Sequence, residues 1–143
     1  MLLKKPESVL VVVYTATGKI LCLQRQDSTN FWQSVTGSLL EGESPLAAAT
    51  RELEEETGLT DPLPQALCYK TRWWFTIYPH WRYRYAPGVT KNLEHVFLCK
   101  IAQECSVILS QEHLAYCWLD KKSALKKMSS DTNQRAIELF VEV

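Results

Sequence analysis

The stretch GSLLEGESPLAAATRELEEETGL, residues 37–59, constrains this chain more than any other segment. It holds six glutamates and a single basic residue, Arg51, and four of the glutamates fall within residues 52–56. Like charges at such spacings destabilise a helix. Two carboxylates about 6 Å apart, in a medium with an effective dielectric constant of about 20, repel each other by roughly 3 kcal/mol. Either solvent and Arg51 offset this repulsion, or a bound cation does.

Local signals place residues 45–57 on a helix. Ser44 can cap the free backbone amides at its start, and Pro45 suits the first helical position. Gly58 suits the position just after the last turn. Apolar side chains recur between these ends at spacings of three and four residues, which predicts a buried stripe packed on a sheet. The members of the stripe are Leu46, Ala49 and Leu53.

The carboxylates on this helix predict a cation site. Glu52 and Glu56 are four residues apart and share one face, and Glu55 is adjacent to both. Convergent carboxylates suit Mg²⁺ or Mn²⁺ better than zinc, and Mg²⁺ commonly bridges to phosphates. The alternative is an exposed charged face, on which Arg51 pairs with Glu55 while solvent surrounds Glu54. The cation hypothesis implies a small phosphorylated substrate.

The remaining pattern predicts a mixed α/β sandwich. Short β-branched or alternating segments indicate strands, and a second amphipathic segment indicates a C-terminal helix. We expect one domain, residues 1–143, because the length is typical of a single domain. The predicted strands cover 8–14, 19–25, 31–37, 67–78, 94–101 and 116–119, and the C-terminal helix covers 133–141.

Composition argues against several classes of protein, among them nucleic-acid-binding, membrane-binding and secreted proteins. Sixteen acidic residues balance sixteen basic ones, so no basic excess favours nucleic acid or a membrane as partner. The five cysteines form no CxxC pair, which favours buried free thiols over disulfides or zinc ligands. Polar residues at 4–7 interrupt the N-terminal apolar run, unlike a signal peptide. We expect a cytoplasmic, monomeric protein.

The glutamate-rich stretch resembles the Nudix box, G-x5-E-x7-R-E-U-x-E-E-x-G-U, at every fixed position. Membership of that family implies an α/β/α sandwich around a mixed sheet, and hydrolysis of a nucleoside diphosphate linked to another moiety. It implies that Arg51 belongs to the catalytic set and that Glu43 and Arg51 support the loop–helix geometry. The metal ligands that it implies are Glu52, Glu55, Glu56 and the carbonyl of Gly37.

Other segments resemble the branch of this family that hydrolyses dihydroneopterin triphosphate in bacterial folate synthesis. They are LQRQD, FWQSVTGS, RYAPGVTKN, EHLAYCWLD and NQRAIE, and together they span most of the chain. This resemblance implies that Glu112 completes the metal site, as a ligand of a second cation or as the base that activates water. The substrate-binding residues that it implies are Lys4, Arg25, Thr36, Phe75, Thr76, Ile77, Tyr78 and Ser130.

Each of these roles competes with a plainer one. The alternatives are a surface charge for Arg25, a disordered chain end for Lys4 and a turn cap for Glu112. Glu94 is an alternative to Glu112 as the carboxylate from outside the Nudix box that completes the metal site. We expect the two histidines that follow these glutamates, His95 and His113, to be structural or solvent-facing.

An aromatic-rich span adds a candidate ring-binding surface. If residues 81–85 form a strand, Arg82 and Arg84 share one face and the aromatic side chains share the other. A pterin could stack there, although core packing is the commoner role for such rings. The aromatic residues of the span are Trp73, Trp74, Trp81, Tyr83 and Tyr85, accompanied by Arg72, Arg82 and Arg84.

The functional hypothesis is Mg²⁺-dependent hydrolysis of the α–β phosphoanhydride of dihydroneopterin triphosphate, which yields the monophosphate and pyrophosphate. Glu56, Glu52 or Glu112 takes the proton, and Arg25 and Lys4 help to neutralise the leaving pyrophosphate. One rival is a broader (d)NTP pyrophosphohydrolase acting on substrates such as dATP. Another is a non-catalytic metabolite sensor with the same fold.

Overall fold

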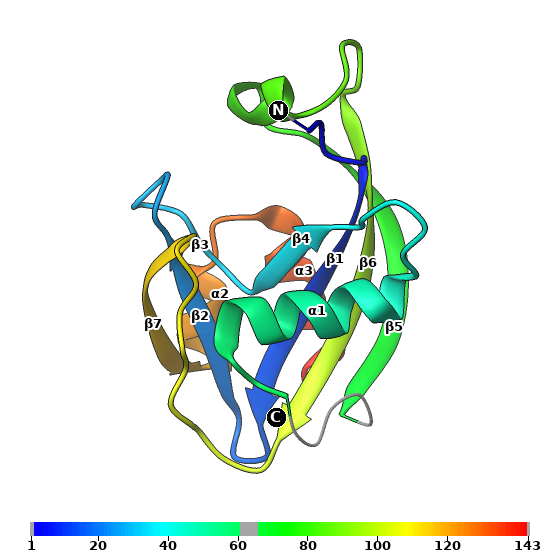
Figure 1. Ribbon diagram of the computed structural model, residues 1–143. Coiled ribbons are helices and arrows are strands. Elements are labelled where there is room, and N and C mark those ends of the chain that lie inside the picture. Colours follow the sequence, from blue (N-terminus) through cyan, green and yellow to red (C-terminus); the bar gives the residue numbers. More distant parts are fainter. Residues whose placement is uncertain (1, 61–65, 143) are drawn as a thin grey trace.

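The computed structural model describes residues 2–60 and 66–142, and its centre is a mixed β-sheet (Figure 1). The main path through the sheet is β3-β2-β1-β6-β5, with β4 paired to β1 and β7 paired to β2. The β1–β6 pair is parallel and the others are antiparallel. The strands are β1 (Glu7–Thr15), β2 (Lys19–Arg25), β3 (Trp32–Gln33), β4 (Val35–Ser38), β5 (Leu67–Thr76), β6 (Lys91–Ile101) and β7 (His113–Asp120).

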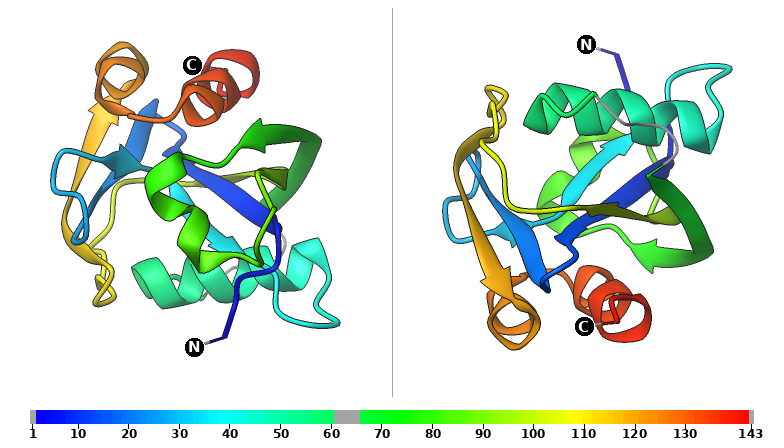
Figure 2. Two further views of the ribbon diagram at one scale, coloured as in Figure 1. Left: turned by 90° about the horizontal axis from the view of Figure 1, so that it is seen from above. Right: turned by 90° about the horizontal axis from the view of Figure 1, so that it is seen from below.

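Helices cover both faces of the sheet, which confirms the predicted α/β/α sandwich. Helix α1 (Pro45–Thr57) lies on one face, and α2 (Lys121–Lys127) and α3 (Asp131–Phe140) lie on the other (Figures 1 and 2). Strand β1 serves both layers because its side chains alternate. Val9, Val11 and Val13 join the core under α1, whereas Leu10 and Val12 join the core under α2 and α3.

Helix α1 begins and ends where its sequence predicts. The Ser44 side chain accepts a hydrogen bond from the Ala47 amide at 3.1 Å. Gly58 adopts a left-handed φ of 78° and donates its amide to the Glu54 carbonyl, 2.8 Å away. Ala49 and Leu53 are fully buried, as the stripe predicts.

The prediction that Leu46 is buried is wrong, because Leu46 is 47% exposed. Leu46 lies in the first turn of α1, where the helix reaches the β5 edge of the sheet (Figure 1). There it lines a surface groove with Tyr69 and Phe97 instead of entering the core.

The predicted strand through the aromatic span is also wrong beyond residue 76. Strand β5 ends at Thr76, and residues Pro79–Arg84 form a short 3-10 helix, η1. Proline lacks the amide that a continuing strand needs, which favours a break there. Arg82 and Arg84 therefore do not share the face of a strand. Helix η1 lies beside the N-terminal segment, beyond the ends of β5 and β6 (Figure 1).

Helix α2 was absent from the sequence prediction. Its sequence, KKSALKK, is short and four of its seven residues are lysines, so it shows little apolar periodicity. The Asp120 side chain caps it by accepting from the Ser123 amide at 2.8 Å. Ala124 is the residue that it buries against the sheet.

All five cysteines are free thiols, and the expectation that they are buried holds for Cys22 and Cys99 but fails for Cys68, which is exposed. Burial raises the pKa of the Cys22 thiol to about 12 and that of Cys99 to about 11. Across residues 2–60 and 66–142, no helix has the length and apolar character needed to cross a bilayer.

We predict that Leu53→Ala destabilises the protein far more than Leu46→Ala does. Leu53 is fully buried under α1, so its truncation leaves a cavity that costs about 2–5 kcal/mol. Leu46 is the matched control on the same helix, and its half-exposed side chain should cost less than about 1 kcal/mol. Urea unfolding measures both free energies. Equal losses would contradict the assignment of the core.

Candidate active site

A cavity of about 1010 Å³ brings together residues from widely separated parts of the chain. Its walls come from the N-terminal segment, from all strands except β7, from α1 and η1, and from the start of α3. Most of the predicted site residues line it, whereas Arg51, Glu55 and Glu56 lie outside its lining. The predicted residues in the lining are Lys4, Arg25, Thr36, Gly37, Glu52, Phe75, Thr76, Ile77, Tyr78, Glu112 and Ser130.

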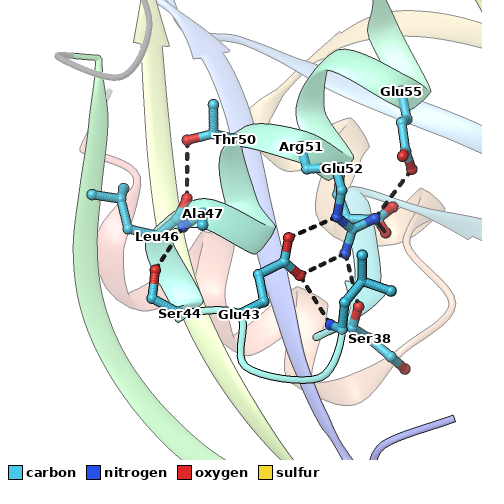
Figure 3. A network of polar contacts seen from close by, with 10 residues as sticks. Ser38, Glu43, Ser44, Leu46, Ala47, Thr50, Arg51, Glu52 and Glu55 are labelled. Carbon is cyan, nitrogen blue, oxygen red and sulfur yellow. Dashed lines mark hydrogen bonds and ion pairs between the residues drawn. The ribbon is translucent and has the colours of Figure 1, made fainter.

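Arg51 organises the loop that precedes α1 (Figure 3). Its guanidinium donates two hydrogen bonds to Glu43, at 2.8 and 2.9 Å, and one to the Ser38 carbonyl at 3.0 Å. The same group donates to Glu52 at 2.6 Å and to Glu55 at 3.3 Å. These bonds lower the pKa of Glu43 and raise that of Arg51, because each charge stabilises the other. Arg51 thus offsets part of the carboxylate repulsion.

Gly37 and Glu52 pack against each other where β4 meets α1. A side-chain carbon at Gly37 would overlap the Glu52 carboxylate where it now lies, so a larger residue at position 37 would have to displace the end of that side chain. Glu52 is 8% exposed and faces the cavity. Its position therefore depends on Gly37 from one side and on Arg51 from the other.

Glu56 is the most deeply buried acid of α1. It is 1% exposed, and neither carboxylate oxygen has a hydrogen-bond partner among residues 2–60 and 66–142. Burial first, and then the neighbouring Glu52, raises the pKa of Glu56 well above its ordinary value. Burial of a charged carboxylate without a partner costs free energy, so either a proton or a bound cation must compensate the charge of Glu56.

His113 lies against this acid, with its Nε2 3.7 Å from Glu56 Oε1 and 3.3 Å from the Gln33 amide nitrogen. Burial lowers the pKa of His113, which favours the neutral ring. His113 and His95 are each 5% exposed, so neither faces solvent. His95 Nε2 lies 2.7 Å from a carboxylate oxygen of Glu7.

The donors at this end of the cavity fit a hard divalent cation. Glu52, Glu56 and the backbone of Gly37 supply oxygen atoms, the ligand type that Mg²⁺ and Mn²⁺ prefer. Glu55 is more remote, because its side chain is 55% exposed and faces Arg51. Among the described side chains, no three acidic, histidine or cysteine groups are close enough to form a complete ligand set. Water or substrate oxygens would have to complete the coordination shell.

Positive charge lines the cavity beside these acids. The Arg25 guanidinium lies 4.4 Å from the centre of the Trp81 ring, and its side chain is 16% exposed. Asp27 accepts hydrogen bonds from Arg25, at 2.6 and 2.7 Å, and from Arg84 at 2.6 Å. Both arginines lower the pKa of Asp27 far below its usual range. Arg25 is therefore a fixed charge of the cavity wall and not a free surface charge.

Two further charges occupy the cavity mouth. The Lys4 amide donates to the Arg84 carbonyl at 2.8 Å, which holds the N-terminal segment against η1. Although the Lys4 residue is largely exposed, desolvation of its ammonium group and the charge of Arg84 lower its pKa. Glu112 also lines the mouth, and its amide donates to Ser110 Oγ at 3.2 Å.

The structure also brings in residues that sequence reasoning missed. Asp27 follows Arg25 by two positions at the end of a strand, a spacing that could have indicated their pairing. The partnership with Arg84 joins residues that are 57 apart in sequence, so local spacing could not reveal it. Other lining residues of this kind are Phe31, Gln33, Thr132 and Asn133.

Comparison with known proteins decides the family. The family profile described as NUDIX domain matches residues 4–140. This chain belongs to the Nudix family. It is 45% identical over 142 residues to the dihydroneopterin triphosphate diphosphatase of Escherichia coli K12, covering 96% of this chain and 93% of that one. It is 43% identical over 141 residues to the Haemophilus influenzae protein of the same name, covering 96% and 89%.

Solved structures agree with this Nudix assignment. The E. coli dihydroneopterin triphosphate pyrophosphohydrolase superposes with a TM-score of 0.93 at 44% identity, over 99% of this chain and 98% of that one. A C. elegans Ap4A hydrolase shares the fold with a TM-score of 0.71 at 22% identity, over 92% of each chain. The chain is thus a Nudix hydrolase, a class that generally uses a divalent metal.

We predict that Arg51→Lys lowers the free energy of unfolding of this Nudix hydrolase by about 1–2 kcal/mol at pH 7. A lysine cannot reproduce the forked contacts to Glu43 and Ser38, and partial solvent screening keeps the loss modest. Because the pKa of Glu43 lies below its ordinary 4.5 in the folded protein, this stabilisation is complete above pH 4.5 and disappears as the pH falls through the lowered pKa.

Urea unfolding at pH 7 and near pH 3 checks this prediction, with Arg72→Lys as the control. Arg72 is an exposed arginine of β5, so its replacement should change little at either pH. A loss for Arg51→Lys that is the same at both pH values would show that the Glu43 ion pair is not its source.

Proposed function

We propose that this Nudix hydrolase converts dihydroneopterin triphosphate to dihydroneopterin monophosphate and pyrophosphate in folate biosynthesis. The observation that carries the proposal is one cavity with carboxylates at one end, fixed positive charge beside them and an apolar, aromatic wall. Such a cavity matches a molecule with a flat ring at one end and a triphosphate at the other. Identity of 43–45% over nearly the full length of two bacterial relatives of that name supports the substrate assignment.

The proposed cation is Mg²⁺, with Mn²⁺ as a substitute, held by Glu52, Glu56 and the Gly37 carbonyl with help from Glu55 and Glu112. When bound, such an ion neutralises phosphate charge and lowers the pKa of a coordinated water. Neither carboxylate oxygen of Glu56 has a hydrogen-bond partner among the described residues, so both are available to an ion. Arg51 has a positioning role here, because it holds Glu52 and Glu55 on a single guanidinium.

The proton of the attacking water passes to a carboxylate of this chain. Glu52 and Glu112 line the cavity, whereas Glu56 lies outside the lining. A water beside the α-phosphorus would therefore meet Glu52 or Glu112 before Glu56. We assign the general base to one of these two and an electrostatic role to Glu56.

Fixed positive charge stabilises the leaving pyrophosphate. Arg25 and Lys4 both line the cavity, and Asp27 together with Trp81 keeps the Arg25 guanidinium in place. A preorganised charge needs no rearrangement as negative charge develops on the leaving group. Thr36, Ser130 and the Phe75–Tyr78 segment would complete the substrate contacts.

A second candidate is a broader (d)NTP pyrophosphohydrolase that accepts substrates such as dATP. Phe31, Tyr78 and Trp81 pack edge to face beside the cavity, and aromatic walls of this kind can also stack on a nucleobase. In either case we propose a monomeric, cytoplasmic enzyme made of one domain, residues 1–143. Its zero net charge favours a small-molecule substrate over nucleic acid.

We predict that Glu56→Gln lowers kcat for pyrophosphate release by about a hundredfold or more, because it removes a buried charge from the cation site. The matched control is Glu54→Gln on the same helix, which should stay within about twofold because Glu54 is exposed. Circular dichroism should show both variants folded, and EDTA should abolish wild-type activity until Mg²⁺ is restored. Near-normal turnover in Glu56→Gln would remove this acid from the mechanism.

A further inference from the structure

The proposed mechanism leaves one buried acid of the cavity without a role. Glu94, on β6, is 4% exposed and lines the cavity. Its Oε1 accepts a hydrogen bond from the indole nitrogen of Trp73 at 2.8 Å. The Thr132 side chain is a second hydrogen-bonding neighbour of this carboxylate. A carboxylate has about four acceptor positions, so these two contacts leave about half of its capacity unused. Burial of such a group is costly unless further donors reach it.

The register of the sheet separates Glu94 from the cation site. Ser8 pairs with Glu94 across the β1–β6 ladder, and Val9 pairs with Gly37 across the β1–β4 ladder. Glu94 and Gly37 thus lie on opposite sides of β1. Two strand spacings place their backbones roughly 10 Å apart. Glu94 therefore belongs to the part of the cavity that would hold the ring of a substrate whose phosphates meet Glu52.

Ser8 adds a donor next to this acceptor. Its hydroxyl oxygen accepts a hydrogen bond from the side-chain amide of Asn92 at 2.7 Å, so the hydroxyl proton remains available to a ligand. Ser8 lines the cavity and is 6% exposed. Because Ser8 and Glu94 are register partners, a donor and an acceptor lie side by side on neighbouring strands.

We propose that Glu94 and Ser8 form the specificity site for a 2-amino-4-oxopyrimidine edge. Glu94 accepts hydrogen bonds from the ring N–H and the exocyclic amino group, and Ser8 donates to the adjacent ring carbonyl. This inference rests on the proposed function, because dihydroneopterin carries that edge. Guanine presents the same two donors and carbonyl. Adenine does not, since its ring nitrogen next to the amino group is an acceptor.

The competing explanation is structural. Glu94 anchors Trp73, which stacks at a centroid distance of 6.4 Å on Phe140 at the end of α3. Loss of a structural anchor would disturb the whole cavity and reduce turnover of every substrate alike. Loss of a ring contact would reduce turnover only of those substrates that carry the edge. The ratio between two substrates separates the explanations.

The experiment measures kcat/KM for dihydroneopterin triphosphate and for dATP in wild type, Glu94→Gln and Glu138→Gln. The Gln side chain keeps the shape of Glu94 but replaces one acceptor by a donor, which opposes the ring donors. We expect kcat/KM for the pterin to fall by about tenfold or more, with dATP changed by less than about threefold. Glu138 is exposed on α3, so its variant should behave as wild type does.

Equal losses on both substrates, or no loss on either, would overturn the inference. If Glu94→Gln does not fold, wild type still provides a test through competitive inhibition by GTP and by ITP, which lacks the 2-amino group. GTP should bind at least about tenfold more tightly, and equal inhibition would overturn the inference.

The same measurements keep the inference separate from the proposed function. A wild-type enzyme that does not prefer the pterin to dATP would contradict the proposed function. A preference for GTP over ITP in that enzyme would still support edge recognition by Glu94.

Discussion

The pairing of Arg51 with the acids around it is the interaction on which the rest of this site depends. Without the positive charge of Arg51 between them, Glu43, Glu52 and Glu55 would repel one another and the loop before α1 would have no fixed path. Arg51 contacts all three and also the Ser38 carbonyl. The loop therefore brings Gly37 of β4 against Glu52. Glu56 lies outside this network, and in the part of the chain that the structure describes its oxygens have no hydrogen-bond partner.

Strand β1 divides the cavity into two chemical regions. On its β4 side lie Gly37 and Glu52, where a cation and the phosphates would meet. On its β6 side lie Glu94 and the start of α3, where polar groups are buried and a ring would fit. Arg25, Asp27 and Arg84 connect β2 with η1 across the mouth. In the proposed function, phosphoanhydride chemistry and substrate choice would depend on different elements of one fold.

Much of this architecture could be predicted because its signals are local. The caps of α1 and the β-branched run of β1 depend on residues close in sequence, and the structure agrees with both. The predicted convergence of Glu52, Glu55 and Glu56 also followed from local spacing, but the Glu55 side chain is 55% exposed and pairs with Arg51. The features that the sequence did not predict depend on contacts between residues far apart in the chain. Whether Leu46 is buried depends on where the sheet ends, and Pro79–Arg84 forms η1 beyond the last strand pair. The links Asp27–Arg84 and Ser8–Glu94 join residues far apart in sequence, so no spacing rule reveals them.

We propose that the cavity of this Nudix hydrolase selects a pterin triphosphate. The most direct test is kcat/KM for Mg²⁺-dependent pyrophosphate release from dihydroneopterin triphosphate against a panel of ribo- and deoxyribonucleoside triphosphates. We expect a preference for the pterin of about tenfold or more, equivalent to about 1.4 kcal/mol of transition-state binding. A flat profile, or a clear preference for dATP, would contradict the pterin assignment while leaving the family chemistry intact.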